Sequence, residues 1–189
     1  MVREIVLFGD EVLRERCQKV AEITEDIRAL ADDMIETMVE AEGVGLAAPQ
    51  VGIAKQLAVI DVTGAKEPLT YFRVDGNVED WTKWMPLKFV NPVLAFPEKA
   101  KCSMNEGCLS FPDVRAEIRR PEDVKATLTL LDGRTITIET DGLLSRAIQH
   151  ETDHLMGILF IDRASPAVKL TLKKKIQKMW EEYAEGPPR

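Results

Sequence analysis

The two histidines of this chain stand four residues apart, in the segment His150-Glu151-Thr152-Asp153-His154. On an α-helix, residues i and i+4 lie one turn apart on the same face, so both imidazoles can reach one metal ion. Glu151 follows the first histidine, where its carboxylate can reach a water molecule on that ion and act as a general base. Two histidines placed at random fall four apart, with glutamate after the first, in on the order of one case in a thousand. The segment therefore predicts a metal-binding helix.

The residues around this segment also favour a helix. Asp141 is a suitable N-cap, and the helix is expected to run to about Met156, where Gly157 ends it. Residues 158–161 form a short apolar run, Ile-Leu-Phe-Ile, which predicts a short strand.

Two further helices are predicted, one near each end of the chain. Residues 25–41 carry apolar side chains at spacings of three and four, and Thr24 is a suitable N-cap. Near the other end, Ser165 precedes a proline, a combination that starts helices, and predicts a C-terminal helix over 166–184. That helix is expected to fray in the Gly-Pro-Pro sequence at 186–188.

The strands are predicted mainly from apolar runs and alternation. Residues 57–62 predict a buried strand, and residues 126–130 and 135–138 alternate on either side of Asp132-Gly133, which is typical of a β-hairpin. Residues 63–90 mix tryptophans, prolines and charges, and we interpret them as a long excursion without regular elements.

Together these elements predict an α+β fold. With 189 residues, 45% of them hydrophobic, we expect a single catalytic domain over 1–189. Antiparallel or mixed β-sheets would surround the central metal-binding helix, with an N-terminal and a C-terminal helix beside them.

Charge and cysteine content restrict where the protein works and what it binds. The net charge of −7 disfavours DNA or RNA as a partner of the whole protein. The first twenty residues do not resemble a signal peptide, and no run approaches the roughly 18 apolar residues of a membrane helix. The odd number of cysteines, three, favours a reducing compartment. We therefore expect a cytoplasmic protein without a membrane partner.

A catalytic site of the zinc type needs three protein ligands and one open position. Because the chain has no third histidine, the third ligand must be a thiolate or a carboxylate. Cys108 is a candidate, since the glycine before it lets the backbone approach closely. Cys17 and Cys102 are more typical of small buried apolar residues. The residues alone leave the choice between Cys108 and a carboxylate open.

Three segments together resemble the signature of the peptide deformylases. They are Gly-Val-Gly-Leu-Ala-Ala-Pro-Gln at 43–50, Glu-Gly-Cys-Leu-Ser at 106–110 and Gln-His-Glu-Thr-Asp-His-Leu at 149–155. Their order and spacing match that family, and weaker similarity extends from about residue 3 to residue 180. The resemblance implies a metal-dependent hydrolase that removes the formyl group from the N-terminal formyl-methionine of new polypeptides.

The resemblance also implies roles for individual residues. Cys108, His150 and His154 would hold one divalent metal ion, Fe²⁺ in the cell and Zn²⁺, Ni²⁺ or Co²⁺ in preparations. Glu151 would move the proton. Gln50 and the backbone N–H of Leu109 would hydrogen-bond the formyl oxygen as it gains negative charge.

The resemblance further implies how a formylated peptide would be held. Val44 and Gly45 would pair with the peptide backbone as a strand does, with Gly107 on the opposite side. The methionine side chain would enter a pocket lined by Val44, Leu143 and Ala147, with Met104 and Arg146 at its walls. From its place on a helix we expect the Arg146 side chain to extend into solvent.

The chain departs from the family pattern in two places. Phe8-Gly9-Asp10 stands where an aromatic residue followed by proline is more common, and the 63–90 excursion is longer than in compact members. Neither departure touches an expected metal ligand or the expected base.

Two alternatives remain. A zinc endopeptidase would share the histidines and Glu151 but would take a carboxylate as third ligand, for example Glu181 or Glu182. The second alternative is not an enzyme, but a structural metal site or a plain binding module. A structural site would need Cys102 beside Cys108 to close the fourth position.

The C-terminal helix carries several lysines, at 169, 173, 174, 175 and 178. Such a face is usually a solvated surface. In family members with a C-terminal helix, that helix can dock on the ribosome near the tunnel exit, so ribosome docking is a second interpretation.

Overall fold

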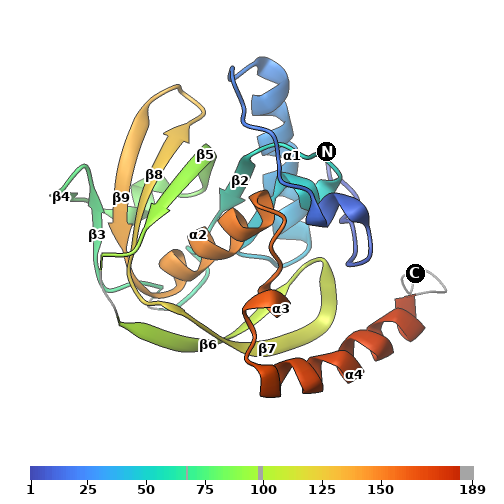
Figure 1. Ribbon diagram of the computed structural model, residues 1–189. Helices are drawn as coiled ribbons and strands as arrows, with labels where there is room; N and C mark the ends of the chain where they lie inside the picture. Colours follow the sequence, from blue (N-terminus) through green and yellow to red (C-terminus); the bar gives the residue numbers. More distant parts are fainter. Residues whose placement is uncertain (67, 98–99, 184–189) are drawn as a thin grey trace.

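A large antiparallel sheet and a separate two-stranded ribbon make up the β-structure of the protein (Figure 1). The computed structural model describes residues 1–66, 68–97 and 100–183. The strands are β1 (Gly45–Ala47), β2 (Leu57–Ile60), β3 (Phe72–Val74), β4 (Asn77–Val78), β5 (Leu87–Ala95), β6 (Lys101–Cys108), β7 (Phe111–Pro121), β8 (Val124–Leu130) and β9 (Thr135–Thr140). The large sheet has the order β1-β2-β5-β8-β9-β3-β4, and β6 pairs with β7. Every pairing between these strands is antiparallel.

The helices complete an α+β domain, the class that the sequence predicts. They are α1 (Glu25–Glu40), α2 (Gly142–Leu155), α3 (Phe160–Arg163) and α4 (Pro166–Tyr183), with 3-10 turns η1 (Glu11–Arg14), η2 (Ala48–Val51) and η3 (Trp81–Trp84). Figure 1 shows α2 at the centre, between the large sheet and the β6–β7 ribbon, with α4 lying along β7. No helix in the described part of the chain is both long enough and apolar enough to cross a membrane.

Helix α1 forms where its apolar spacing predicts. The Thr24 hydroxyl accepts a hydrogen bond from the N–H of Ile27, which confirms the expected N-cap. Its apolar face is buried against β1 and β2. The helix ends in a turn at Glu42, whose φ of 54° is incompatible with a continued helix.

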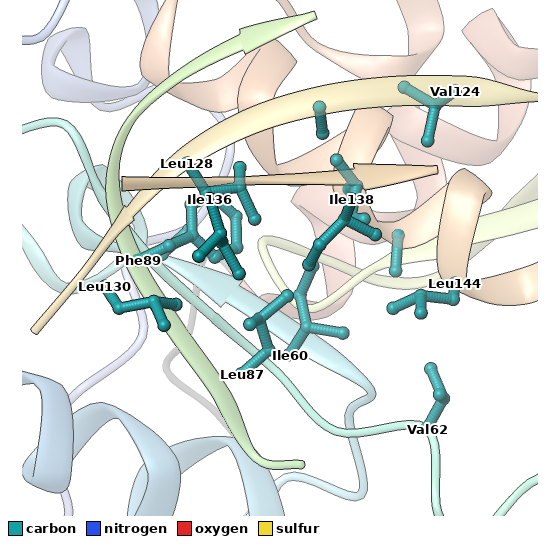
Figure 2. Close-up of a cluster of buried hydrophobic side chains, with 14 of the residues drawn as sticks. Ile60, Val62, Leu87, Phe89, Val124, Leu128, Leu130, Ile136, Ile138 and Leu144 are labelled. Carbon is teal, nitrogen blue, oxygen red and sulfur yellow. The ribbon is translucent and has the colours of Figure 1, made fainter. Parts of the chain in front are cut away.

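The large sheet and α2 share one apolar core. The β8–β9 hairpin turns at Gly133, where φ is 93°, and thus confirms the predicted hairpin. Leu144 of α2 lies with side chains of β2, β5, β8 and β9 in the cluster that Figure 2 shows. Burial of this cluster fixes α2 against the sheet.

The prediction of an excursion without elements at 63–90 is wrong. This stretch contains β3, β4 and η3, and β5 begins within it. Asp75 and Gly76 have φ of 49° and 83° and connect β3 to β4, so they form the Asp-Gly turn that favours a hairpin. The hairpin extends the sheet, because β3 pairs with β9.

The predicted strand at 158–161 is also wrong, because a helical turn, α3, begins at Phe160. The Asp162 carboxylate accepts a hydrogen bond from the N–H of Leu159 at 2.9 Å and closes this turn. A four-residue apolar run is buried equally well as a strand or as a helical turn, so its composition cannot distinguish them.

Helix α4 begins at Pro166, as the sequence predicts, and the expected fraying at 186–188 lies outside the described residues. Trp180 of this helix lies against Gly9, where a Cβ atom would come within 2.2 Å of the indole. The φ of Gly9 is +116°, which proline cannot adopt. The departure from the aromatic–proline pattern therefore makes room for α4.

Candidate metal centre

Helix α2 carries an unusual number of buried polar residues. Twelve of its fourteen residues are buried, among them His150 and His154 at 9% and 1% exposure. Buried imidazoles require partners, because an unpaired polar group in the interior is costly. His154 Nδ1 has none among the described residues.

A thiol from the β6–β7 ribbon completes a cluster with these histidines. The donor atoms of Cys108, His150 and His154 all lie within 4.8 Å of one another, and Cys108 Sγ is 3.3 Å from His154 Nε2. One sulfur and two imidazole nitrogens suit a transition-metal ion, and three protein ligands leave a position open for water. The donor set therefore fits a catalytic metal ion.

Glu106 orients one of the histidines, a role that sequence reasoning missed. His150 Nδ1 donates to Glu106 Oε2 at 3.1 Å, which leaves Nε2 available to a metal ion. The carboxylate is buried and accepts two further hydrogen bonds from Arg120, at 2.7 and 3.0 Å. Its place two residues before Cys108 is the signal that could have revealed this role.

Protonation in the cluster follows burial and neighbouring charge. Burial alone would raise the pKa of Glu106, but hydrogen bonds from His150 and Arg120 outweigh it and hold the pKa at about 2. Burial lowers the pKa of His154 well below its ordinary value. Burial also opposes a charge on His150, but Cys108 and Glu106 beside it raise its pKa.

Glu151 faces the cleft from the same helix. Its side chain is buried, and Oε2 has no partner in the described part of the protein. A Cβ atom at position 45 would come within 2.3 Å of Glu151 Oε1, so a larger residue there would require the Glu151 side chain to move. Burial raises the pKa of Glu151 to about 7.

Gln50 presents its amide nitrogen to the cluster. Its Oε1 accepts from the N–H of Ala47 at 2.9 Å, and this bond fixes which end of the amide faces inward. Nε2 then lies 3.4 Å from Cys108 Sγ and 3.2 Å from Ser110 Oγ. Leu109 follows Cys108 and lines the same cleft.

A cavity of about 520 Å³ opens beside the cluster. All the residues that the sequence suggested for peptide binding line it: Met104 and the set Val44, Gly45, Gly107, Leu143, Arg146 and Ala147. Gln50, Cys108, His150 and Glu151 line it as well, so the structure brings these candidates to one place.

The prediction that Arg146 extends into solvent is wrong, because its side chain is 4% exposed. Its guanidinium donates to Glu106 Oε1 at 2.8 Å, to the carbonyl of Ile118 at 3.1 Å and to the carbonyl of Cys102 at 2.9 Å. Arg146 thus links α2 to both strands of the ribbon. The buried carboxylate of Glu106, 40 residues away in the chain, holds it inside.

The ligands that the alternatives require lie elsewhere. Cys102 does not belong to the donor cluster, and its Sγ lies 3.1 Å from Arg146 Nη2. Glu181 and Glu182 are exposed on α4, where they contact Gln177 and Lys178 of the same helix.

An α+β domain with a Cys–His–His donor cluster beside a cleft can hold a catalytic metal ion, and comparisons with known proteins identify the family. Residues 2–170 match the model of the polypeptide deformylase family. The chain therefore belongs to this family.

Individual relatives support the same family assignment. A peptide deformylase of Methylacidiphilum infernorum is 41% identical over 179 residues, which cover 95% of this chain and 93% of the relative. Among solved structures, the peptide deformylase of Thermotoga maritima is 36% identical, with a TM-score of 0.74 and coverage of 88% of this chain and 99% of that one. That of Ehrlichia chaffeensis in complex with actinonin is 31% identical, with a TM-score of 0.82 and coverage of 96% and 98%.

Proposed function

We propose that the protein binds one divalent metal ion through Cys108, His150 and His154 and deformylates N-terminal formyl-methionine on new polypeptides. The observation that carries this proposal is the donor cluster, of which Cys108 and His150 line a cleft beside Glu151, whose buried Oε2 has no partner among the described residues. Membership of the family supports the reaction class.

The substrate backbone would lie along β1. This strand is at the edge of the large sheet, so its outer side carries no other strand of the described chain. An extended peptide can add to such an edge, pairing with Val44 and Gly45, while Gly107 faces it from the ribbon. The methionine side chain would enter the part of the cleft lined by Leu143 and Ala147.

When bound, a divalent cation supplies a Lewis acid that makes hydroxide available near neutral pH. Glu151 accepts a proton from the attacking water and passes it to the nitrogen of the leaving amine. Gln50 Nε2 and the N–H of Leu109 donate to the formyl oxygen as its negative charge develops. Loss of one such donor typically lowers turnover by on the order of 10² to 10³.

Ferrous iron is our proposal for the metal in the cell. A thiolate ligand such as Cys108 suits ferrous iron as well as zinc, and it makes the site sensitive to oxidation. We expect the activity of the iron-loaded protein to decay in air. An iron-loaded sample that keeps its full activity in oxygenated buffer would contradict the expected decay in air.

We propose further that the protein is cytoplasmic and that α4 docks on the ribosome. Lys169, Lys173, Lys174, Lys175 and Lys178 are all exposed on this helix. A phosphate-rich surface would attract such a face. Co-sedimentation with ribosomes that falls as salt rises is the expected result, and an absence of co-sedimentation at low salt would refute docking.

Formate release from a formyl-methionyl tripeptide tests the function. The protein is loaded with ferrous iron under anaerobic conditions, and formate and internal peptide cleavage are measured on the same sample. We expect formate and an intact peptide with a free amine. Internal cleavage without formate would instead indicate the endopeptidase.

A further inference from the structure

The first turn of α2 is capped by a distant segment rather than by its own N-cap side chain. The carbonyl of Pro68 accepts hydrogen bonds from the N–H groups of Leu143 and Leu144, at 2.6 and 3.3 Å. The first N–H groups of a helix have no partner within the helix, so an outside acceptor fixes where the helix begins. Residues 68–70, the capping segment, supply that acceptor.

Asp141 holds the capping segment in place. It occupies the N-cap position, as the sequence predicts, but its carboxylate makes no capping hydrogen bond. Instead the Asp141 side chain, at 9% exposure, accepts from the N–H of Thr70 at 2.7 Å and from the Thr70 hydroxyl. The expected capping role is therefore corrected: Asp141 ties the capping segment to α2.

The capping segment and the start of α2 are in close contact. Gly142 has a φ of +61°, and a Cβ atom there would come within 2.6 Å of the Pro68 carbonyl oxygen and 3.0 Å of Leu69 Cα. A displacement of the capping segment is therefore transmitted directly to the start of α2.

The residue that receives this displacement lines the cavity. Leu143 follows Gly142, its N–H is bonded to Pro68, and its side chain forms part of the cavity wall. Leu69 and Leu143 also pack against the same apolar core. His150 stands seven residues further along, about two helical turns, and has its own contact to Glu106.

We infer that the capping segment is a positioning element that sets the side-chain selectivity of the methionine pocket by fixing Leu143. This inference rests on the proposed function. The segment contacts neither the donor cluster nor Glu151 in any hydrogen bond described for it, so it acts on substrate choice and binding rather than on the chemical step.

The test compares two Asp→Ala variants that loosen the same region from opposite sides. Asp141→Ala removes the tie to α2. Asp123→Ala, the matched control, removes the acceptor of the Tyr71 hydroxyl, 2.9 Å away, and leaves α2 alone. The readout is the ratio of kcat/KM for formyl-methionyl and formyl-leucyl tripeptides, measured on iron-loaded protein.

We expect Asp141→Ala to lower this ratio by about tenfold, the effect of a methylene-sized misfit in an apolar pocket. We expect most of this change to come from a higher KM for the formyl-methionyl peptide, while kcat stays within about twofold of the wild-type value. Asp141→Asn, whose oxygen can still accept from the Thr70 N–H, is expected to restore the ratio to within about twofold of the wild type.

Several outcomes would overturn the inference. An unchanged kcat/KM ratio in Asp141→Ala would overturn it, and so would an equal fall of the ratio in Asp123→Ala. In both cases the proposed function still holds as long as the wild type releases formate. No formate from the wild type would overturn both. If Asp141→Ala does not fold, Thr70→Val, which removes one hydroxyl, is measured instead. We expect Thr70→Val to lower the kcat/KM ratio by about threefold, and an unchanged ratio would overturn the inference.

Discussion

Replacement of Glu106 should lower both the stability of the protein and its affinity for a metal ion. Its carboxylate accepts hydrogen bonds from two arginines, Arg120 and Arg146, and from His150, at 2.7 to 3.1 Å. Glu106→Gln keeps the shape but removes the charge. It also turns an N–H₂ group toward one of these donors, because donors face both carboxylate oxygens.

The magnitude follows from these contacts. Arg120 and Arg146 are 3% and 4% exposed, so the variant leaves them short of a buried countercharge. Breaking a buried ion pair in this way costs about 3–5 kcal/mol of unfolding free energy. For a chain of this size that lowers Tm by about 6–20 °C. Loss of the His150 contact should in addition weaken metal binding by about 10- to 100-fold.

Two assays on the same samples check this reasoning. Urea unfolding measures the loss of stability, and competition with a chromophoric chelator measures metal affinity. Glu117→Gln is the matched control, since Glu117 is exposed on β7 of the same ribbon and should change stability by no more than about 0.5 kcal/mol. If Glu106→Gln loses less than about 1 kcal/mol and keeps its metal affinity, the buried network does not orient His150.

Three further predictions concern packing. Gly9→Ala should lower the unfolding free energy by about 1–3 kcal/mol, because alanine is strained at a φ of +116° and its Cβ meets Trp180. Urea unfolding measures the loss, with Gly64→Ala as the control because a Cβ there meets nothing within 4 Å. Equal losses of stability in the two variants would refute the prediction. Thr152→Val should raise the unfolding free energy by about 1 kcal/mol, because it removes a buried hydroxyl that has no partner among the described residues; a loss of stability in the same assay would show that the hydroxyl is paired. Burial raises the pKa of Cys17 to about 11, so iodoacetamide at pH 8 should label it only on unfolding, and rapid labelling of the native protein in mass spectra would contradict its burial.

Features determined by neighbouring residues could be predicted from the sequence. The Thr24 cap, the turn at Gly133 and the start of α4 at Pro166 each depend on a few adjacent residues, and each forms as predicted. The Asp-Gly turn at Asp75 is equally local, but the charged and aromatic residues after it hid the signal. It could have been found.

Features determined by distant residues could not be predicted from the sequence. Arg146 is buried because Glu106 meets it across 40 positions of the chain, and Asp141 turns away from its own helix because Thr70 offers two donors 71 positions away. Periodicity and spacing describe one segment at a time, so they place a residue on an element without showing which partner it will meet.

The most direct test of the proposed mechanism compares formate release by the wild type and by Glu151→Gln at equal, measured iron content. If Glu151 moves the proton, the variant should bind the metal and release formate at least 10²-fold more slowly, the lower end of what a general acid–base residue contributes. A Glu151→Gln protein that holds its iron and deformylates at the wild-type rate would contradict the mechanism.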